Sequence, residues 1–185
     1  DDLPAQRTAG VIQKYAGRAL LVTTGVCPVH CRYCFRRHFP YDELPQGAEA
    51  WERALEAIAD DATIIEAILS GGDPLMLVDP TLERLTKRLR SIPHIQRLRI
   101  HTRMPIMIPS RVCDKLLDWM TSWPTPPLMV VHVNHPREID AEVAAACQRL
   151  RQAGVLLLNQ AVLLRGVNDD ADVQCALSLR LLDVG

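Results

Sequence analysis

Three cysteines, Cys27, Cys31 and Cys34, lie within eight residues of one another, directly after an apolar run. Their C-x3-C-x2-C spacing lets one short loop direct three thiolates at a common centre. Three soft anionic ligands in such a loop suit an iron–sulfur cluster or zinc. Three arginines in the same stretch are expected to favour the thiolate forms and to balance the charge of a negative cluster. The stretch is therefore the first candidate for chemistry in this chain.

The number of ligands distinguishes the kinds of site that this loop could form. An electron carrier normally binds all four irons of a cubane cluster through cysteines, and three cysteines leave one iron open. An open position is typical of catalytic metal sites, and here it could chelate the amino and carboxylate groups of a methionine-type ligand. Two alternatives stay open from the spacing alone. One is a structural zinc site with His30 or His38 as the fourth ligand, and the other is a closed electron-transfer cluster.

The elements that position this loop are predicted from short apolar runs and turn signals. The loop follows an apolar, β-branched strand at 19–24, and further strands are expected at 64–69, at 97–102, at 128–133 and from Val155. From the second strand onwards the units recur about every 30 residues, which is the length of a βαβ step. This period predicts a parallel sheet with right-handed crossovers.

Helices are predicted between these strands from apolar stripes and capping residues. The first is expected at 48–59, and the second has Asp79 as its N-cap. Ser110 is expected to cap the third helix and Gly154 to end the fourth. The last helix is expected to begin near residues 169–170. Five such units cannot close an eight-unit barrel, which needs about 250 residues, so an open, curved sheet is expected.

Polar residues follow one predicted strand after another. In parallel α/β folds the carboxyl ends of the strands build the functional site, so these groups are expected to converge on one face. Each group also has an ordinary interpretation, because a Gly-Gly pair can be only a tight turn and polar residues at a sheet end can be satisfied locally. The groups are Ser70-Gly71-Gly72-Asp73, His101-Thr102-Arg103, His132 with Asn134, and Asn159-Gln160.

The residues around the cysteines also resemble a known family. The cysteine motif, with Tyr33 before its last cysteine, resembles the signature of the radical S-adenosylmethionine (SAM) enzymes. Residues 31–41, Cys-Arg-Tyr-Cys-Phe-Arg-Arg-His-Phe-Pro-Tyr, are similar to the lysine 2,3-aminomutase branch. Within that branch they are most similar to the bacterial members that make β-lysine for modifying elongation factor P. The resemblance runs from about Lys14 to about Asp169.

The resemblance implies an α/β fold, a partial (β/α) TIM-like barrel of the radical SAM type. The chain is expected to hold about five of its βα units, with the sixth strand after Gly185. Residues 1–18 are expected to form an N-terminal segment that belongs to the pyridoxal phosphate (PLP) contact region, and residues 19–185 the incomplete radical SAM core. The start at Asp1 without methionine and the end just after a predicted helix indicate an excised piece.

The resemblance also implies the reaction, an isomerisation of L-lysine to β-lysine. A reduced [4Fe-4S] cluster on Cys27, Cys31 and Cys34 would pass one electron to SAM, and the resulting 5′-deoxyadenosyl radical would take hydrogen from C3 of L-lysine held on PLP. The nitrogen would then migrate from C2 to C3. An external one-electron reductant is required, and elongation factor P is connected only through the β-lysine product. The family's SAM contacts are matched by Ser70, Gly71, Gly72, Asp73, Thr102, His132 and Gln160.

A further set of residues resembles the family's PLP and substrate contacts. Lys14, Tyr15 and Arg18 resemble the segment that contacts PLP, and Arg36 resembles the arginine that pairs with the substrate carboxylate. A PLP enzyme needs a Schiff-base lysine, and none of the three lysines of this chain is a suitable candidate. That lysine, and the carboxylates that bind the substrate's side-chain amine, are expected after Gly185. No catalytic residue beyond the cluster ligands is therefore expected here, and a radical SAM reaction on another amino acid stays an alternative.

Composition limits the class of protein. A net charge of −1, with the basic residues scattered outside the cysteine loop, argues against a nucleic-acid-binding protein. No apolar run approaches the roughly 20 residues that a membrane-spanning helix needs, so we expect no membrane span and a cytoplasmic protein. The other three cysteines, Cys113, Cys147 and Cys175, are expected to be buried thiols on helices in a reducing compartment.

Overall fold

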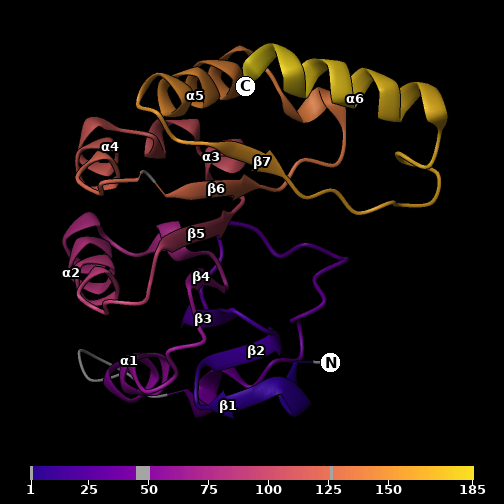
Figure 1. Cartoon of the computed structure of the whole chain (residues 1–185). Helices are drawn as coiled ribbons and strands as arrows, with labels where there is room; N and C mark the ends of the chain where they lie inside the picture. Colours follow the sequence, from indigo (N-terminus) through magenta and orange to yellow (C-terminus); the bar gives the residue numbers. More distant parts are fainter. Residues whose placement is uncertain (1, 45–50, 126) are drawn as a thin grey trace. The chain divides into compact units, whose positions relative to one another are not determined.

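The computed structural model describes residues 2–44, 51–125 and 127–185. The chain forms two compact units, Asp1–Ile100 and His101–Gly185 (Figure 1). Each unit combines strands with helices, which confirms the predicted α/β class.

The described residues of the first unit form η1 Leu3–Ala5, β1 Gln6–Thr8, β2 Val11–Tyr15, β3 Arg18–Thr24, η2 Tyr41–Glu43, α1 Glu52–Ala59, β4 Glu66–Gly71, η3 Pro74–Met76, α2 Asp79–Arg90 and β5 Arg97–Thr102. The last two residues of β5 belong to the second unit. The strands of this unit lie in the order β1-β2-β3-β4-β5. The pairs β1/β2 and β2/β3 are antiparallel, whereas β3/β4 and β4/β5 are parallel. Helices α1 and α2 connect the parallel strands and lie beside them (Figure 1).

The core of the first unit lies between its parallel strands and its two α-helices. Leu21, Leu69 and Ile100, one on each parallel strand, are fully buried, as are Ile58 of α1 and Leu89 of α2. Burial of each of these side chains contributes roughly 1.5–3 kcal/mol to folding. This packing holds the carboxyl ends of β3 and β4, from which the cysteine loop and the Gly-Gly turn continue.

The sequence pattern does not predict strands β1 and β2. Both are short, and β2 buries two adjacent residues, Val11 and Ile12, so it lacks the alternation of a half-buried strand. Gly17, with φ +79°, makes the tight turn that pairs Tyr15 with Arg18. Part of the expected N-terminal segment is therefore a regular part of the sheet.

Most predicted elements of this unit are present, with shifted ends. Strand β4 begins at Glu66, two residues later than expected. Helix α1 covers the second part of the predicted helix 48–59, of which 48–50 lie outside the described residues. Asp79 is the first residue of α2 and not its N-cap, because Val78 has the extended backbone of the capping position.

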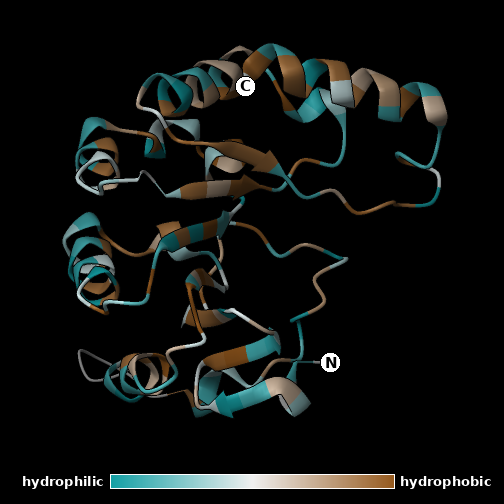
Figure 2. Cartoon of the chain, viewed as in Figure 1, coloured by the Kyte–Doolittle hydropathy of each residue, from teal (hydrophilic) through white to brown (hydrophobic). Residues whose placement is uncertain are grey.

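The described residues of the second unit form α3 Met104–Met107, η4 Pro109–Arg111, α4 Asp114–Thr121, β6 Leu128–Val131, η5 Pro136–Glu138, α5 Ala141–Gln152, β7 Leu157–Asn159 and α6 Ala171–Val184. Strands β6 and β7 are parallel, with Met129 opposite Leu157. Helix α5 packs against β7, α3 and α6. Both strands are mainly hydrophobic (Figure 2), and Leu116, Met129 and Leu150 are fully buried. Within the described ranges, no helix has the length and apolar character to span a membrane.

Two predicted helix boundaries of the second unit are confirmed, and a third is wrong. Gly154, with φ +81°, directly follows the C-cap of α5. Asp170 is the N-cap of α6, and its side chain accepts hydrogen bonds from two N–H groups of the first turn at 2.9 and 3.2 Å. Ser110 does not cap a helix, because it lies inside the short turn η4 that Pro109 begins. Helix α4 starts only after the extended residue Cys113.

The three cysteines outside the loop differ in exposure. All six cysteines are free thiols, and Cys147 on α5 is buried as predicted. The prediction is wrong for the other two, because Cys113 precedes α4 and is half-buried, and Cys175 on α6 is exposed. Helix α6 buries Leu177 and Val184, which lie on one side of the helix, and Cys175 lies on the opposite side at about 100° per residue.

Candidate active site

The cysteine loop begins at the carboxyl end of β3, whose last residue is Thr24. Backbone hydrogen bonds form successive turns in the loop. The N–H of Cys34 donates to the carbonyl of Cys31 at 3.1 Å, and the N–H of Arg37 donates to the carbonyl of Cys34 at 3.3 Å. All three cysteines of the motif are half-buried. These turns bring Cys31 and Cys34 together on one short stretch of backbone.

Burial and neighbouring charges favour the neutral thiol of Cys27 over its thiolate. Burial raises the pKa of the Cys27 thiol to about 11, and the Asp73 carboxylate, Cys34 and Cys31 add to this rise. The expectation that neighbouring arginines favour the thiolate is therefore wrong for Cys27, and Arg36 instead binds a carboxylate elsewhere in the unit. A coordinated metal offsets such a rise, because it deprotonates the thiols that bind it.

The donor set fits an iron–sulfur cluster by residue type. Three thiols from one half-buried loop are soft ligands of the kind that such clusters need. Among the described residues, no group of three or more His, Cys, Asp or Glu side chains is already arranged to hold a metal ion. The three cysteines as ligands therefore stay a prediction from their spacing. His30 and His38, the alternative fourth ligands for zinc, are both exposed.

The Gly-Gly turn after β4 packs directly against the start of the cysteine loop. The N–H of Gly72 donates to the carbonyl of Thr24 at 2.6 Å, and the N–H of Asp73 donates to the carbonyl of Val26 at 2.8 Å. A Cβ on Gly72 would lie 2.3 Å from the Val26 carbonyl oxygen. Gly71 has φ +121°, and a Cβ there would lie 2.7 Å from the Thr24 carbonyl oxygen. Both glycines are thus required by the contact between the two loops, and their contact with SAM stays a prediction.

The polar side chains beside these glycines are held by the protein itself. Asp73 is buried, and its side chain accepts a hydrogen bond from the N–H of Leu75 at 3.0 Å, which caps η3. The Ser70 hydroxyl accepts a hydrogen bond from Arg36 Nη1 at 3.1 Å, and the Ser70 carbonyl accepts one from the Thr23 hydroxyl at 3.0 Å. The turn therefore connects the end of β4 to a residue of the cysteine loop, Arg36.

A single carboxylate brings together two of the predicted cofactor and substrate residues. Asp2 Oδ2 accepts a hydrogen bond from Arg36 Nε at 2.6 Å, and Asp2 Oδ1 lies 2.6 Å from Lys14 Nζ. Asp2 and Arg36 are both buried. The basic groups that resemble the PLP-phosphate and substrate-carboxylate contacts therefore face the same anionic group.

The other two PLP candidates lie elsewhere in the unit. Tyr15 is exposed, and the Arg18 guanidinium carbon is 5.8 Å from the centre of its ring. Arg18 Nε also lies 3.8 Å from Glu66 Oε2. Arg18 begins β3 and the cysteine loop follows the end of that strand, so about 20 Å of extended chain separates them. Of the three predicted PLP contacts, Lys14 is the one that shares a carboxylate partner with Arg36 in the described residues.

The predicted SAM residues of the second unit lie at the carboxyl ends of β5, β6 and β7. Thr102 is buried, and its hydroxyl accepts a hydrogen bond from the N–H of Met104 at 3.0 Å. The His132 ring meets the His101 ring edge-on, with 5.8 Å between the ring centres. Gln160 has an exposed side chain, and its N–H donates to the carbonyl of Val131 at 2.9 Å.

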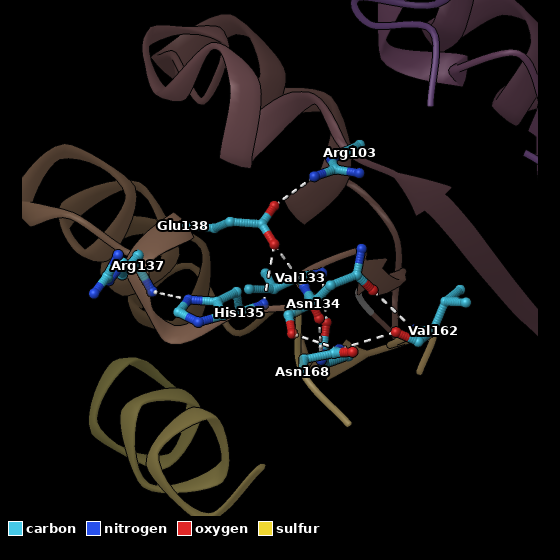
Figure 3. A network of polar contacts seen from close by, with 9 residues as sticks. Arg103, Val133, Asn134, His135, Arg137, Glu138, Val162 and Asn168 are labelled. Carbon is cyan, nitrogen blue, oxygen red and sulfur yellow. Dashed lines mark hydrogen bonds and ion pairs between the residues drawn. The ribbon is translucent and has the colours of Figure 1, made fainter. Parts of the chain in front are cut away.

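Glu138 joins the chain after β5 to the chain after β6 (Figure 3). Its Oε1 accepts hydrogen bonds from the N–H groups of Asn134 and His135 at 2.8 and 3.0 Å. Its Oε2 binds the guanidinium of Arg103. Arg103 directly follows Thr102, so Glu138 fixes the chain next to two of the predicted SAM residues, Thr102 and His132.

Asn168 joins the chain after β6 to the chain after β7 (Figure 3). It is fully buried, and its Nδ2 donates to the carbonyls of Asn134 and Val162 at 2.7 and 2.9 Å. The Asn134 side chain in turn accepts a hydrogen bond from the N–H of Val162 at 2.8 Å. The two loops are therefore fastened by amide side chains.

Sequence reasoning missed three residues that hold these groups, namely Asp2, Glu138 and Asn168. Each of the three has a partner that is 34 or 35 positions away in the sequence. The short motif His135-Pro136-Arg137-Glu138 does carry a local signal, because a polar residue followed three positions later by glutamate is typical of a capping box. Asp2 and Asn168 lack such a signal, since acidic and amide residues are also common in ordinary turns.

The chain is similar to a known protein family and to several curated proteins. Residues 21–174 match the family described as the Radical SAM superfamily. The chain is 49% identical over 181 residues to L-lysine 2,3-aminomutase of Haemophilus influenzae, a match that covers 98% of this chain and 54% of that protein. It is 48% identical over 176 residues to the Escherichia coli protein of the same name, covering 95% and 52%. Identity to the Clostridium subterminale protein of that name is 39% over 178 residues, covering 95% and 42%. The chain thus spans about half the length of these curated relatives.

Proposed function

Since this chain belongs to the radical SAM superfamily, we propose that the whole protein is a lysine 2,3-aminomutase, an isomerase that converts L-lysine to β-lysine. The observation that carries the proposal is the C-x3-C-x2-C loop at the end of β3, packed against the Gly-Gly turn at the end of β4. The Haemophilus influenzae and Escherichia coli relatives align with 98% and 95% of this chain at 49% and 48% identity, and they are named for that activity. The chain spans about half their length, so the activity is proposed for the whole protein.

In this proposal, Cys27, Cys31 and Cys34 hold a [4Fe-4S] cluster that, when bound, supplies the electron for cleavage of SAM. The chain contributes three soft ligands in a half-buried loop and leaves one iron open for SAM. The glycines of the turn support this assignment, because they leave the backbone beside the loop free of side chains. The proposed SAM contacts are Ser70, Gly71, Gly72, Asp73, Thr102, His132 and Gln160.

The proposed PLP and substrate contacts lie on the hairpin and in the cysteine loop. Arg36 is proposed to bind the carboxylate of L-lysine, for which a guanidinium fork is suited. Lys14 is proposed to bind the PLP phosphate, supported by its 2.6 Å distance from the carboxylate that also binds Arg36. Tyr15 and Arg18 are proposed as PLP contacts by resemblance, and the Arg18 guanidinium carbon lies 5.8 Å from the centre of the Tyr15 ring. When bound, PLP holds the amino group that migrates.

The same proposal assigns partners and a location. The substrate is L-lysine, an external donor supplies one electron, and elongation factor P is reached only through the β-lysine product. We place the reaction in the cytoplasm, where a reducing environment keeps the six cysteines as thiols.

Anaerobic reconstitution of the full-length protein with iron and sulfide tests the proposal. We expect a cluster that dithionite reduces, cleavage of SAM to 5′-deoxyadenosine, and conversion of L-lysine to β-lysine in the presence of PLP. Replacing any of Cys27, Cys31 or Cys34 by alanine should abolish all three. Cys175→Ala is the matched control, because this thiol is exposed on α6, and it should change none of them.

Two other outcomes would contradict the proposal in different ways. Stoichiometric zinc with no SAM cleavage would indicate a structural zinc module. A reducible cluster that cleaves SAM but leaves L-lysine unchanged would indicate a radical SAM enzyme for another substrate, and offering other amino acids in the same assay would identify it.

A further inference from the structure

Asp2 is a buried carboxylate between two cations. Its side chain is 6% exposed, and the Arg36 side chain is 9% exposed. The two form an ion pair at 2.6 Å, and the ammonium of Lys14, which is partly exposed, lies 2.6 Å from the second carboxylate oxygen. Removing one partner of such a buried pair leaves an uncompensated charge, so Asp2 and Arg36 depend on each other for their positions.

Two nitrogens of the Arg36 guanidinium group have partners in the protein. Nε donates to Asp2, Nη1 donates to the Ser70 hydroxyl at 3.1 Å, and the Phe35 ring lies 4.6 Å from the guanidinium carbon. A guanidinium has five N–H groups in one plane. Within the part of the chain that the structure describes, Nη2 donates no hydrogen bond, and one N–H of Nη1 also remains. The end of the group formed by Nη1 and Nη2 is the edge that pairs bidentately with a carboxylate.

The charges of this cluster favour a further anion. Asp2 alone would neutralise Arg36, but Lys14 adds a second positive charge to the same carboxylate. The three side chains together therefore keep one net positive charge. A second carboxylate at the end of Arg36 would complete the neutralisation.

We propose that Asp2 is a positioning residue for substrate binding, which holds Arg36 by its Nε so that Nη1 and Nη2 present two parallel donors to the carboxylate of the amino-acid substrate. This inference rests on the proposed function, since it assigns the substrate carboxylate to Arg36. Ser70, near the carboxyl end of β4, supports the same orientation, so the proposed substrate arginine is connected to the proposed SAM loop.

The test uses the full-length, reconstituted protein with the substitution Asp2→Asn, which keeps the size of the side chain and removes its charge. We expect the KM for L-lysine to rise at least tenfold, while iron content and SAM binding stay as in the wild type. Inhibition by 1,5-diaminopentane, which is lysine without its carboxylate, should be equal in both proteins. Asp60→Asn is the matched control, because Asp60 is an exposed carboxylate of the same unit, and its KM should not change.

Several results would overturn the inference. One is an unchanged KM for L-lysine in Asp2→Asn, and another is an equal loss of affinity for L-lysine and 1,5-diaminopentane, which would indicate a general structural role. If Asp2→Asn does not accumulate, Asp2→Glu takes its place, because the longer carboxylate displaces Arg36 and should cause the same selective rise in KM. A wild-type protein that forms no β-lysine would contradict the proposed function instead. The role of Asp2 is judged only from the difference in KM between the variant and the wild type.

Discussion

Single atoms determine how closely the two loops of the first unit approach each other. A Cβ on Gly72 would meet the backbone of Val26 at 2.3 Å, and no rotamer change can relieve a clash with backbone. We therefore expect Gly72→Ala to lower the free energy of unfolding by roughly 3 kcal/mol and to weaken iron binding by the loop. Denaturant unfolding and the iron content after reconstitution measure the two effects.

Gly166 provides a control that separates this clash from backbone strain. Its φ is +69°, so alanine is strained there, but an added Cβ would meet no atom within 4 Å. Gly166→Ala should therefore cost only about 1 kcal/mol and leave iron binding unchanged. If Gly72→Ala proves no less stable than Gly166→Ala, contact between the loops is not the reason for glycine at position 72.

The Asp2 cluster also predicts a pH dependence. Burial raises the pKa of Asp2, but the hydrogen bonds and charges of Lys14 and Arg36 outweigh burial and hold it below the ordinary value of 3.8. A carboxyl with a lowered pKa stabilises the folded state above its unfolded pKa, and this contribution is lost as the pH falls through the folded pKa. Between about pH 5 and pH 2 the wild type should therefore lose more stability than Asp2→Asn. Urea unfolding across this range measures the difference, and parallel curves would contradict the ion-pair interpretation.

At the scale of elements, buried amide side chains join the loops after β6 and β7. Asn168 makes three hydrogen bonds to backbone groups, since its Oδ1 also accepts from the N–H of Leu164 at 2.6 Å. We expect Asn168→Ala to lower the free energy of unfolding by roughly 2–4 kcal/mol, because buried backbone groups lose their partner. Glu142→Ala, at an exposed position on α5, should change stability by about 0.5 kcal/mol or less. Equal stability of the two variants would contradict the conclusion that the Asn168 side chain stabilises these loops.

The elements that sequence analysis predicts correctly are those with local signals. Strand β3 has an apolar run that ends in three β-branched residues, a glycine with positive φ follows the C-cap of α5, and α6 begins after a capping aspartate. The elements that it misses or misplaces lack such signals. Strand β2 is short and without alternation, and Ser110 resembles a helix cap but lies in the turn that Pro109 begins.

In the candidate site, too, the sequence shows the local motifs but not the contacts between distant residues. The C-x3-C-x2-C motif and the Gly-Gly turn are local, so the sequence shows them, although the close contact between their backbones becomes visible only in the structure. The contacts of Asp2 with Arg36 and of Glu138 with Arg103 join residues 34 and 35 positions apart. Such contacts depend on the packing of whole strands, and no spacing within a short window can predict them.

At the scale of the whole molecule, the resemblance of the cysteine motif to the radical SAM enzymes is confirmed, because the radical SAM match covers residues 21–174. That match also confirms the predicted fold class, a partial TIM-like barrel of the radical SAM type. The alignments with the two lysine 2,3-aminomutases show that this chain spans about half of the length of those proteins. Experiment can therefore ask which steps of the proposed reaction these 185 residues carry out alone.

The settings of the three lysines indicate that this chain alone lacks the lysine that would bind PLP. Lys14 pairs with Asp2, Lys87 pairs with Glu83 on α2 at 2.7 Å, and Lys115 is exposed on α4. None lies in the enclosed setting that a Schiff-base lysine needs to lose its proton. We therefore expect the 185-residue chain, reconstituted alone, to hold a cluster but to form no β-lysine, whereas the full-length protein forms it.

Parallel assays of iron content, 5′-deoxyadenosine and β-lysine on the two proteins distinguish the possible failures. A chain that binds iron but forms no β-lysine agrees with a PLP lysine outside these residues, and a chain that binds no iron shows that the loop needs further elements to assemble. Measurable β-lysine from the 185-residue chain would contradict the prediction, since one of its own lysines would then have to carry PLP. Substituting Lys14, Lys87 and Lys115 in turn by alanine would show which of the three does so.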